Sequence, residues 1–166
     1  MEKLTKREKE VLKELLINCK VSDQEIARKL KTSRPTIFKI RKRLEKENII
    51  KEYIPRINLE KFNLNVQMTI LYKWKDYSNK KELEKLINFI KSSPEIIFFS
   101  ESLDISKKIN IIISFHENLE ECENFLNKIK DGMKNNIEDM EIVLSSRKNI
   151  IKNYDFSSLI LNKMKE

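Results

Sequence analysis

Glycine is almost absent from this chain, with one residue in 166. A loop that cradles phosphate with its backbone needs several closely spaced glycines, so P-loop and GxGxxG nucleotide sites are excluded. Histidine occurs once, as His116, and cysteine twice, as Cys19 and Cys122. These residues match no zinc or disulfide spacing, and no second histidine or cysteine can join His116 in catalysis. We therefore predict no metal, no cofactor and no enzymatic activity, and we expect His116 to lie at an exposed strand end.

Long apolar runs are also missing. No stretch is long and uncharged enough to span a bilayer, and no secretory signal pattern opens the sequence. No segment has the basic face and aromatic-rich apolar face of a membrane-surface helix. Together with the two cysteines, which form no disulfide pattern, these absences predict a cytoplasmic protein without membrane association.

Charge is abundant and unevenly distributed. The chain carries 34 Lys+Arg and 26 Asp+Glu, a net charge of +8. Residues 1–58 contain 17 basic and 9 acidic residues and hold all of this excess, whereas residues 59–166 contain 17 of each. This asymmetry is typical of a module that binds a polyanion, joined to a neutral module.

The segment Ser33–Glu47 concentrates the positive charge, with six basic residues against two acidic ones. Ser33 is a favourable N-cap and Pro35 is tolerated in a first helical turn. The apolar residues at helical spacing are Ile37, Ile40 and Leu44. The basic residues mostly lie on the other side, so the spacing predicts a helix with one buried side and one cationic side. Such a helix fits the major groove of DNA, where Lys and Arg bind phosphates or guanine edges.

Two further helices precede this one. The segments Thr5–Glu8 and Ser22–Glu25 have the pattern of capping boxes, which start helices. Apolar spacing extends the first helix to about Asn18 and gives a short second helix. Lys31 and Thr32 form a turn so short that the second and third helices make a helix-turn-helix.

The residues after the third helix suggest a wing. Asn48 is an acceptable left-handed helix end. The following apolar residues, Ile49 to Ile57, predict a strand or hairpin, and Pro55 would place that strand at a sheet edge.

The N-terminal sequence L-T-K-R-E-K-E-V-L-K-E-L, V-S-D-Q-E-I-A-R-K-L and T-S-R-P-T-I-F-K-I-R-K-R-L-E-K-E-N-I-I-K-E-Y resembles the winged helix-turn-helix of the leucine-responsive/asparagine (Lrp/AsnC) regulators. Lys31 and Asn48 replace two glycines that are usual in that family. The resemblance implies contacts to double-stranded DNA from Ser33, Arg34, Thr36, Lys39 and Lys42, and the helix geometry adds Arg43 and Lys46. Phe38 is interpreted as a shoulder of the core rather than a thymine-methyl contact.

The rest of the chain alternates strand and helix patterns. Period-two alternation predicts strands at Val66–Trp74, Ile96–Leu103, Ile109–His116 and Glu141–Ser146. Helical spacing predicts helices at Lys80–Ser92 and from Leu119 to about Ile137. The order βαββαβ is that of a ferredoxin-like domain, so the fold class is α+β: a winged helix-turn-helix at 1–58, a linker at 59–65, and a ferredoxin-like domain with a C-terminal extension at 66–166.

A sheet with helices on one face leaves its other face in need of a partner. Leu71, Ile112 and the run Ile96–Phe99 suggest that this face is apolar, and pairing of two sheets would cover it. We expect a homodimer, with an octamer left open. In the Lrp/AsnC family this domain dimerises and often binds an amino acid near a glycine-containing loop. Glu101–Lys108 contains no glycine, which argues against an ordinary amino-acid effector, and no ligand residue is assigned.

Three interpretations follow. The first is a sequence-specific transcriptional regulator that binds palindromic sites as a dimer or higher oligomer. The second is an enzyme similar to the sirohaem decarboxylases, which share the layout, but the second domain offers only His116 and Arg147 for such a site. The third is a non-specific, chromatin-like DNA-binding protein. We favour the first. The tail, Arg147–Glu166, is apolar enough to form a last strand and a short helix.

Overall fold

The computed structural model describes residues 4–101, 109–133, 136–152 and 154–164. The chain forms two compact units: Met1–Arg56 with Asn153–Glu166, here called the N-terminal unit, and Ile57–Lys152, the C-terminal unit. The second is therefore an insertion within the first. The sequence pattern had placed the whole tail with the second domain, whereas the structure groups its last part with the first.

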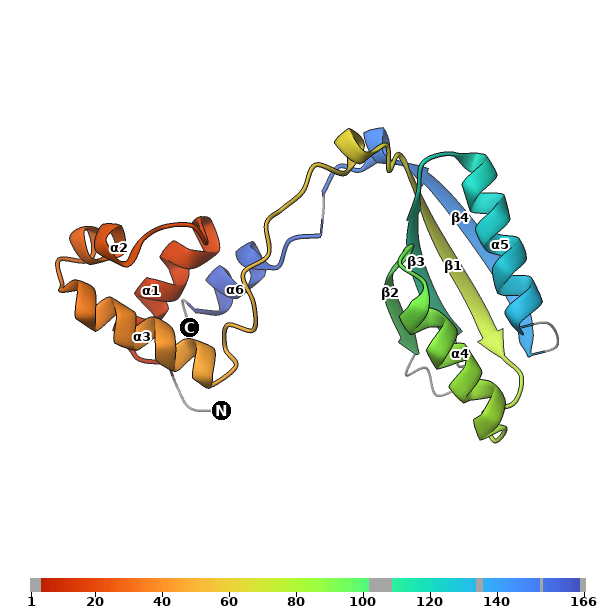
Figure 1. Cartoon of the computed structure of the whole chain (residues 1–166), viewed down its shortest axis with the longest axis horizontal. Coiled ribbons are helices and arrows are strands. Elements are labelled where there is room, and N and C mark those ends of the chain that lie inside the picture. The colour runs from red at the N-terminus through yellow and green to blue at the C-terminus, as the bar shows by residue number, and fades with distance from the viewer. Residues whose placement is uncertain (1–3, 102–108, 134–135, 153, 165–166) are drawn as a thin grey trace. The chain divides into compact units, whose positions relative to one another are not determined.

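The N-terminal unit contains three helices, α1 (Lys6–Ile17), α2 (Asp23–Lys29) and α3 (Arg34–Lys46), shown in Figure 1. Both expected capping boxes are present, at Thr5 and at Ser22. In each, the capping side chain and a glutamate three residues later satisfy backbone N–H groups that have no partner within the helix. The three helices bury one core, formed by Val11, Leu15, Val21, Ile26, Ala27 and Ile37.

The expected wing strand is not formed. Residues 51–58 contain neither helix nor strand among the described residues, and all eight are exposed. Pro55 has no N–H to give to a ladder, and the described part of the N-terminal unit contains no strand that could pair with this segment. Of the apolar residues that suggested a strand, Ile54 and Ile57 remain in solvent, whereas Ile50 packs against the core of the three helices.

The C-terminal unit is a four-stranded antiparallel sheet with helices α4 (Lys80–Ser92) and α5 (Leu119–Met133). Its strands are β1 (Val66–Trp74), β2 (Ile96–Glu101), β3 (Ile109–His116) and β4 (Ile137–Ser146), in the spatial order β2-β3-β1-β4. The expected βαββαβ order is confirmed. The connector to this unit includes a short 3-10 helix, η1 (Leu59–Phe62).

Both helices cover the same face of the sheet. Alternate residues of β1 are buried in one cluster with residues of α4 and α5: Met68, Ile70, Tyr72, Trp74, Leu86, Phe125 and Ile129. Ile112 belongs to this cluster, so its assignment to the uncovered face was wrong. Ile112 pairs with Ile70, which fixes its side chain on the helix-covered side.

The single histidine is also buried. His116 is 2% exposed, rather than lying at a wet strand end as expected. Its Nε2 is 2.8 Å from the Ser114 hydroxyl, and its ring lies 5.0 Å from that of Phe125. Burial lowers the pKa of His116. The expectation failed because β3 continues as a buried strand to its last residue, beneath α5.

Strand β4 begins four residues earlier than expected, and α5 ends earlier too. Ile137 pairs with Trp74 at the start of the ladder. Asp139 then has a positive φ of 47°, and the register shifts between Leu71 and Lys73. This irregularity interrupts the two-residue alternation, which is why the periodicity revealed only the part of the strand after it.

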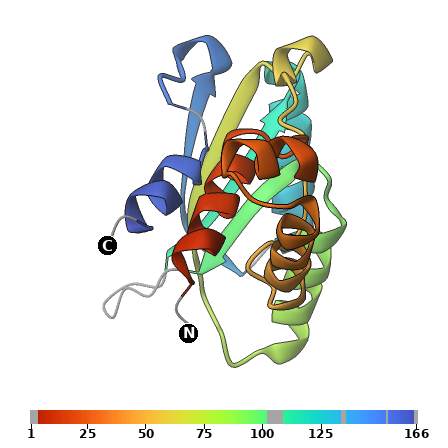
Figure 2. The same cartoon turned by 90° about the vertical axis from the view of Figure 1, so that its left-hand side faces the viewer.

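The tail contains two short helices, η2 (Arg147–Asn149) and α6 (Ser157–Lys163), and no strand among its described residues. Figures 1 and 2 show α6 beside α1. Within the described ranges, no helix has the length and apolar character needed to cross a membrane.

Candidate nucleic-acid interface

The turn between α2 and α3 is built on a left-handed lysine. Lys31 has a φ of 50°, the conformation that glycine usually supplies. Two hydrogen bonds close the end of α2, from Lys31 N to Arg28 O at 3.4 Å and from Thr32 N to Ala27 O at 2.9 Å, the pattern of a Schellman motif. The turn is therefore complete without glycine, and Ser33 starts the next helix immediately.

Helix α3 ends in the same way. Asn48 has a φ of 55°, and hydrogen bonds run from Asn48 N to Glu45 O at 3.0 Å and from Ile49 N to Leu44 O at 2.9 Å. Asparagine tolerates this conformation better than most residues. Both positions where the sequence lacks the expected glycine thus keep the backbone that a glycine would have.

The exposed side of α3 carries three cations without a carboxylate partner. Arg34, Lys39 and Lys46 are exposed, and no Asp or Glu of the described residues lies within ion-pair distance of them. Ile37 and Leu44 face the core, each fully buried. The helix therefore has the two-sided character that the sequence predicted, with unneutralised positive charge facing solvent.

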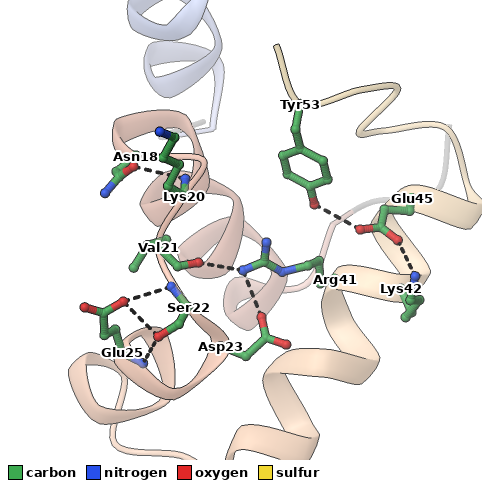
Figure 3. Close-up of polar contacts among 10 residues, drawn as sticks. All are labelled: Asn18, Lys20, Val21, Ser22, Asp23, Glu25, Arg41, Lys42, Glu45 and Tyr53. Atoms are coloured by element: carbon green, nitrogen blue, oxygen red, sulfur yellow. Dashed lines mark hydrogen bonds and ion pairs between the residues drawn. The ribbon is translucent and has the colours of Figure 1, made fainter. Parts of the chain in front are cut away.

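Lys42 is also exposed but is paired. Its Nζ donates to Glu45 at 3.0 Å, and Glu45 in turn accepts a hydrogen bond from the Tyr53 hydroxyl at 3.1 Å (Figure 3). The bond from Lys42 is the main reason that the pKa of Glu45 is lowered. An exposed ion pair three residues apart contributes roughly 0–1 kcal/mol, so a phosphate can compete for this lysine.

Arg43 is committed within the N-terminal unit. Its guanidinium lies 2.7 Å from Glu8, whose side chain is almost completely buried, and 2.6 Å from Glu47. Thr5, by its backbone and side-chain hydrogen bonds, and Arg43, by its charge, all lower the pKa of Glu8. Because leaving the Glu8 carboxylate without a partner would be costly, Arg43 acts as a structural link between α3 and α1. The sequence had assigned Arg43 to DNA, and the structure gives it two carboxylate partners.

Arg41 holds α2 against α3, a role that was not predicted from the sequence. Its Nη2 donates to the Val21 carbonyl at 3.0 Å and lies 2.8 Å from Asp23 Oδ1 (Figure 3). The contact to Asp23 is an ion pair by distance without the geometry of a hydrogen bond. The guanidinium also lies 5.8 Å from the centre of the Tyr53 ring. The signal was available: Arg41 is four residues after Ile37, which places it on the buried side.

The beginning of α3 presents small polar groups and one aromatic ring. The hydroxyls of Ser33 and Thr36 are 2.7 Å apart, and Ser33 accepts a hydrogen bond from Thr36 N at 3.3 Å. Phe38 is 52% exposed, so its interpretation as part of the core was wrong. Lys42 Nζ lies 6.0 Å from the centre of the Phe38 ring. The arrangement combines hydroxyls, an apolar ring and cations on one exposed helix, which are the groups that contact phosphates and base edges.

The sequence also suggested an effector loop and a sirohaem-type site. The loop 102–108, where the family places its effector, lies outside the described residues. Arg147 packs over the Phe115 ring at 5.3 Å, and His116 is buried against Ser114. Each of these two residues thus has an internal packing contact.

Residues 4–51 match a protein family described as winged helix-turn-helix DNA-binding. No curated protein matches the sequence. The family match covers the three helices and both left-handed turns of the N-terminal unit.

Solved structures extend the likeness to the whole chain. An AsnC family transcriptional regulator from Agrobacterium tumefaciens has a TM-score of 0.78 at 14% identity, over 90% of this chain and 94% of that one. LrpC from Bacillus subtilis has a TM-score of 0.70 at 23% identity, over 92% and 98%. A transcriptional regulator from Neisseria meningitidis, in complex with L-methionine, has a TM-score of 0.77 at 17% identity, over 95% and 99%. The chain has the fold of the Lrp/AsnC transcriptional regulators, which confirms the α+β architecture expected from sequence.

Proposed function

We propose that the protein is a sequence-specific, DNA-binding transcriptional regulator of the Lrp/AsnC type, working in the cytoplasm. The exposed side of α3 carries this proposal, because Arg34, Lys39 and Lys46 have no carboxylate partner among the described residues. An α-helix with such a side fits the major groove, with Lys and Arg on phosphates and smaller groups near base edges. The proposed contacts are Ser33, Arg34, Thr36, Lys39, Lys42 and Lys46.

We further propose that two copies pair through the uncovered face of the sheet. Cross-strand partners share a face, so the ladders align Phe98, Ile113, Thr69 and Val143 in one row away from α4 and α5. Phe98 and Val143 are 47% and 52% exposed. Leu71 and Ile111 form part of the next row. An apolar face of this kind is typical of a subunit interface, and we propose a dimer or a higher oligomer built from it.

A two-fold symmetric dimer should bind a DNA site made of two symmetry-related half-sites. We expect two half-sites with centres about 10 base pairs, or a multiple of that, apart. Selection from random double-stranded DNA with the purified protein, followed by footprinting, tests this expectation. Two protected half-sites at fixed spacing would support a regulator, whereas uniform protection of any DNA would indicate a chromatin-like coating protein.

The role of α3 is tested through salt. Replacing Lys39→Ala should reduce the slope of log K against log salt concentration by up to about 0.9 for each phosphate that the lysine neutralises. Lys13→Ala, on the exposed side of α1, is the matched control and should leave the slope unchanged. Equal slopes for Lys39→Ala and the unmodified protein would remove Lys39 from the interface.

The dimer is tested by placing a charge on the uncovered face. Phe98→Asp should yield monomers in analytical ultracentrifugation and weaken binding to a two-half-site DNA by roughly 10²-fold or more, because the second half-site no longer benefits from effective concentration. Leu119→Asp introduces the same charge at an exposed residue of α5 and should change neither property. Dimers that persist in Phe98→Asp would show that another surface joins the subunits.

A further inference from the structure

The end of the chain is held on the N-terminal unit at two places. At the start of the segment 154–164, Arg56 Nη2 donates to Tyr154 O at 3.1 Å and lies 4.0 Å from Asp155 Oδ2. At its end, Lys9 Nζ donates to Met164 O at 2.9 Å. Between these contacts, α6 lies beside α1 (Figures 1 and 2).

Helix α6 depends on this contact for its structure. It has seven residues, and isolated helices shorter than about 12 residues are marginal in water. At its start, Phe156 makes no capping bond and the Asp155 carboxylate accepts one hydrogen bond, from Ser157 N at 2.9 Å. Ser157, Leu161 and Met164 are partly buried and recur at helical spacing, while Leu159 is exposed. Lys9 adds a cation at the C-terminal end of α6, where the helix dipole is negative. Docking on the N-terminal unit therefore supplies what the sequence of α6 lacks.

The segment also changes how the two units are connected. The chain leaves the N-terminal unit after Arg56 and rejoins it after Lys152. The first part of the outgoing connector, residues 51–58, has neither helix nor strand and is exposed throughout, and the connector continues through η1. A single connector of this kind would leave the N-terminal unit free to turn, whereas a second crossing restricts that rotation.

We propose that the segment 154–164 is a clasp: it docks on α1 through the side formed by Ser157, Leu161 and Met164, and it thereby limits the orientations of α3 relative to the C-terminal unit. In a dimer, this restriction fixes the spacing between two copies of α3. The docking stands independently of the proposed function, while its consequence for DNA spacing rests on it.

Amide hydrogen exchange of the full-length protein without DNA tests the docking. The Met164 and Ile160 amides donate to carbonyls one helical turn earlier, at 3.0 and 2.9 Å. We expect them to exchange at least ten-fold more slowly than in an unstructured chain. Leu161→Asp should abolish this protection, whereas Leu159→Asp, the same change on the exposed side, should retain it. Fast exchange in the unmodified protein, or equal protection in the two variants, would overturn the clasp.

A crosslink tests whether the clasp docks on its own chain. Lys13→Cys, one helical turn after Lys9 on α1, and Lys163→Cys, beside Met164, are combined with Cys19→Ser, so that Lys9 and the docking side of α6 are unchanged; the buried Cys122 is left in place. A short bis-maleimide should then give a product of monomer size on a denaturing gel, in which mass spectrometry of the digested protein finds the two introduced cysteines joined to each other. A dimer-sized product would show that the segment is exchanged between copies, and it would overturn the assignment to the same chain.

The effect of the clasp on the orientation of α3 is measured by selecting binding sites from random double-stranded DNA. The unmodified protein and Leu159→Asp should select half-sites at one spacing, and Leu161→Asp should select a wider range. One spacing for all three proteins would show that the clasp does not orient α3. If none of them binds DNA, the proposed function fails, while the exchange and crosslinking results still decide whether the clasp exists.

Discussion

Replacing Arg41→Ala should destabilise the N-terminal unit without acting on DNA directly. The guanidinium donates to the Val21 carbonyl at 3.0 Å, and a hydrogen bond to a charged group contributes about 1.5–3 kcal/mol. Its ion pair with Asp23 joins two side chains that are each 17% exposed and adds up to about 1 kcal/mol. The contact with Tyr53 adds about 0.5–1 kcal/mol. Because these terms share one side chain and are not additive, we expect a loss of about 2–3 kcal/mol.

Native-state hydrogen exchange is the suitable assay, because the chain has two units and a single unfolding midpoint would mix them. Exchange of the buried α3 amides, at Ile37 and Leu44, reports the opening of the N-terminal unit. A loss of about 2 kcal/mol speeds their exchange about 30-fold. Arg41→Lys keeps the charge but loses the planar fork, and it should have an intermediate effect. Lys39→Ala removes the same charge from the exposed side and should change exchange by less than about two-fold.

Comparing Arg41→Ala with Lys39→Ala separates a structural role from a DNA-binding role among the basic residues of α3. Arg41→Ala should alter stability and leave the salt slope of DNA binding unchanged, whereas Lys39→Ala should do the reverse. If Arg41→Ala speeds exchange by less than about two-fold, the contacts to Val21 and Asp23 do not hold α2 to α3.

Three further predictions concern other residues. Burial lowers the pKa of His116, so the unfolded state binds the proton more readily than the folded state does. The C-terminal unit should therefore lose stability as pH falls below about 6.5. Thermal melts of His116→Gln should lack that loss. Glu8 follows the same sign at lower pH: its lowered pKa stabilises the folded state above about pH 4.5, and this contribution disappears as pH falls. Exchange of the N-terminal unit in Glu8→Gln should therefore vary less with pH between about 5 and 3. Ile70→Ala removes a fully buried side chain from the sheet core and should cost about 2–5 kcal/mol in denaturant unfolding of the C-terminal unit, whereas Ile97→Ala, on an exposed side chain, should cost far less.

The helices and strands were largely predictable because their signals are local. Both capping boxes at Thr5 and Ser22 start helices where expected, and the strand Val66–Trp74 was found at its true bounds from alternation alone. Strand β4 was placed late because the left-handed Asp139 breaks its period. The segment 49–57 was predicted to be a strand because its residues favour extended backbone, but a strand also needs a partner, which local sequence does not specify.

The candidate interface was predictable in its charge and less so in its detail. The cationic side of α3 follows from residue spacing, and Lys39 lies where that spacing put it. The partner of Arg43 could not be derived in the same way, because Glu8 lies 35 residues away in the sequence. For Lys42, local spacing does not decide between an ion pair with Glu45 and contact with solvent, because the two differ little in free energy. The docking of α6 involves a separation of 155 residues between Lys9 and Met164, for which local patterns carry no information.

The insertion of one unit within the other has a consequence for biosynthesis. Helix α6 leaves the ribosome only after all of Ile57–Lys152 has been translated. During that interval, α1 to α3 can already fold around their own core, but the surface of α1 that receives α6 stays uncovered. The nascent chain therefore passes through a stage in which its DNA-binding helices are formed while their last packing partner has not yet been made.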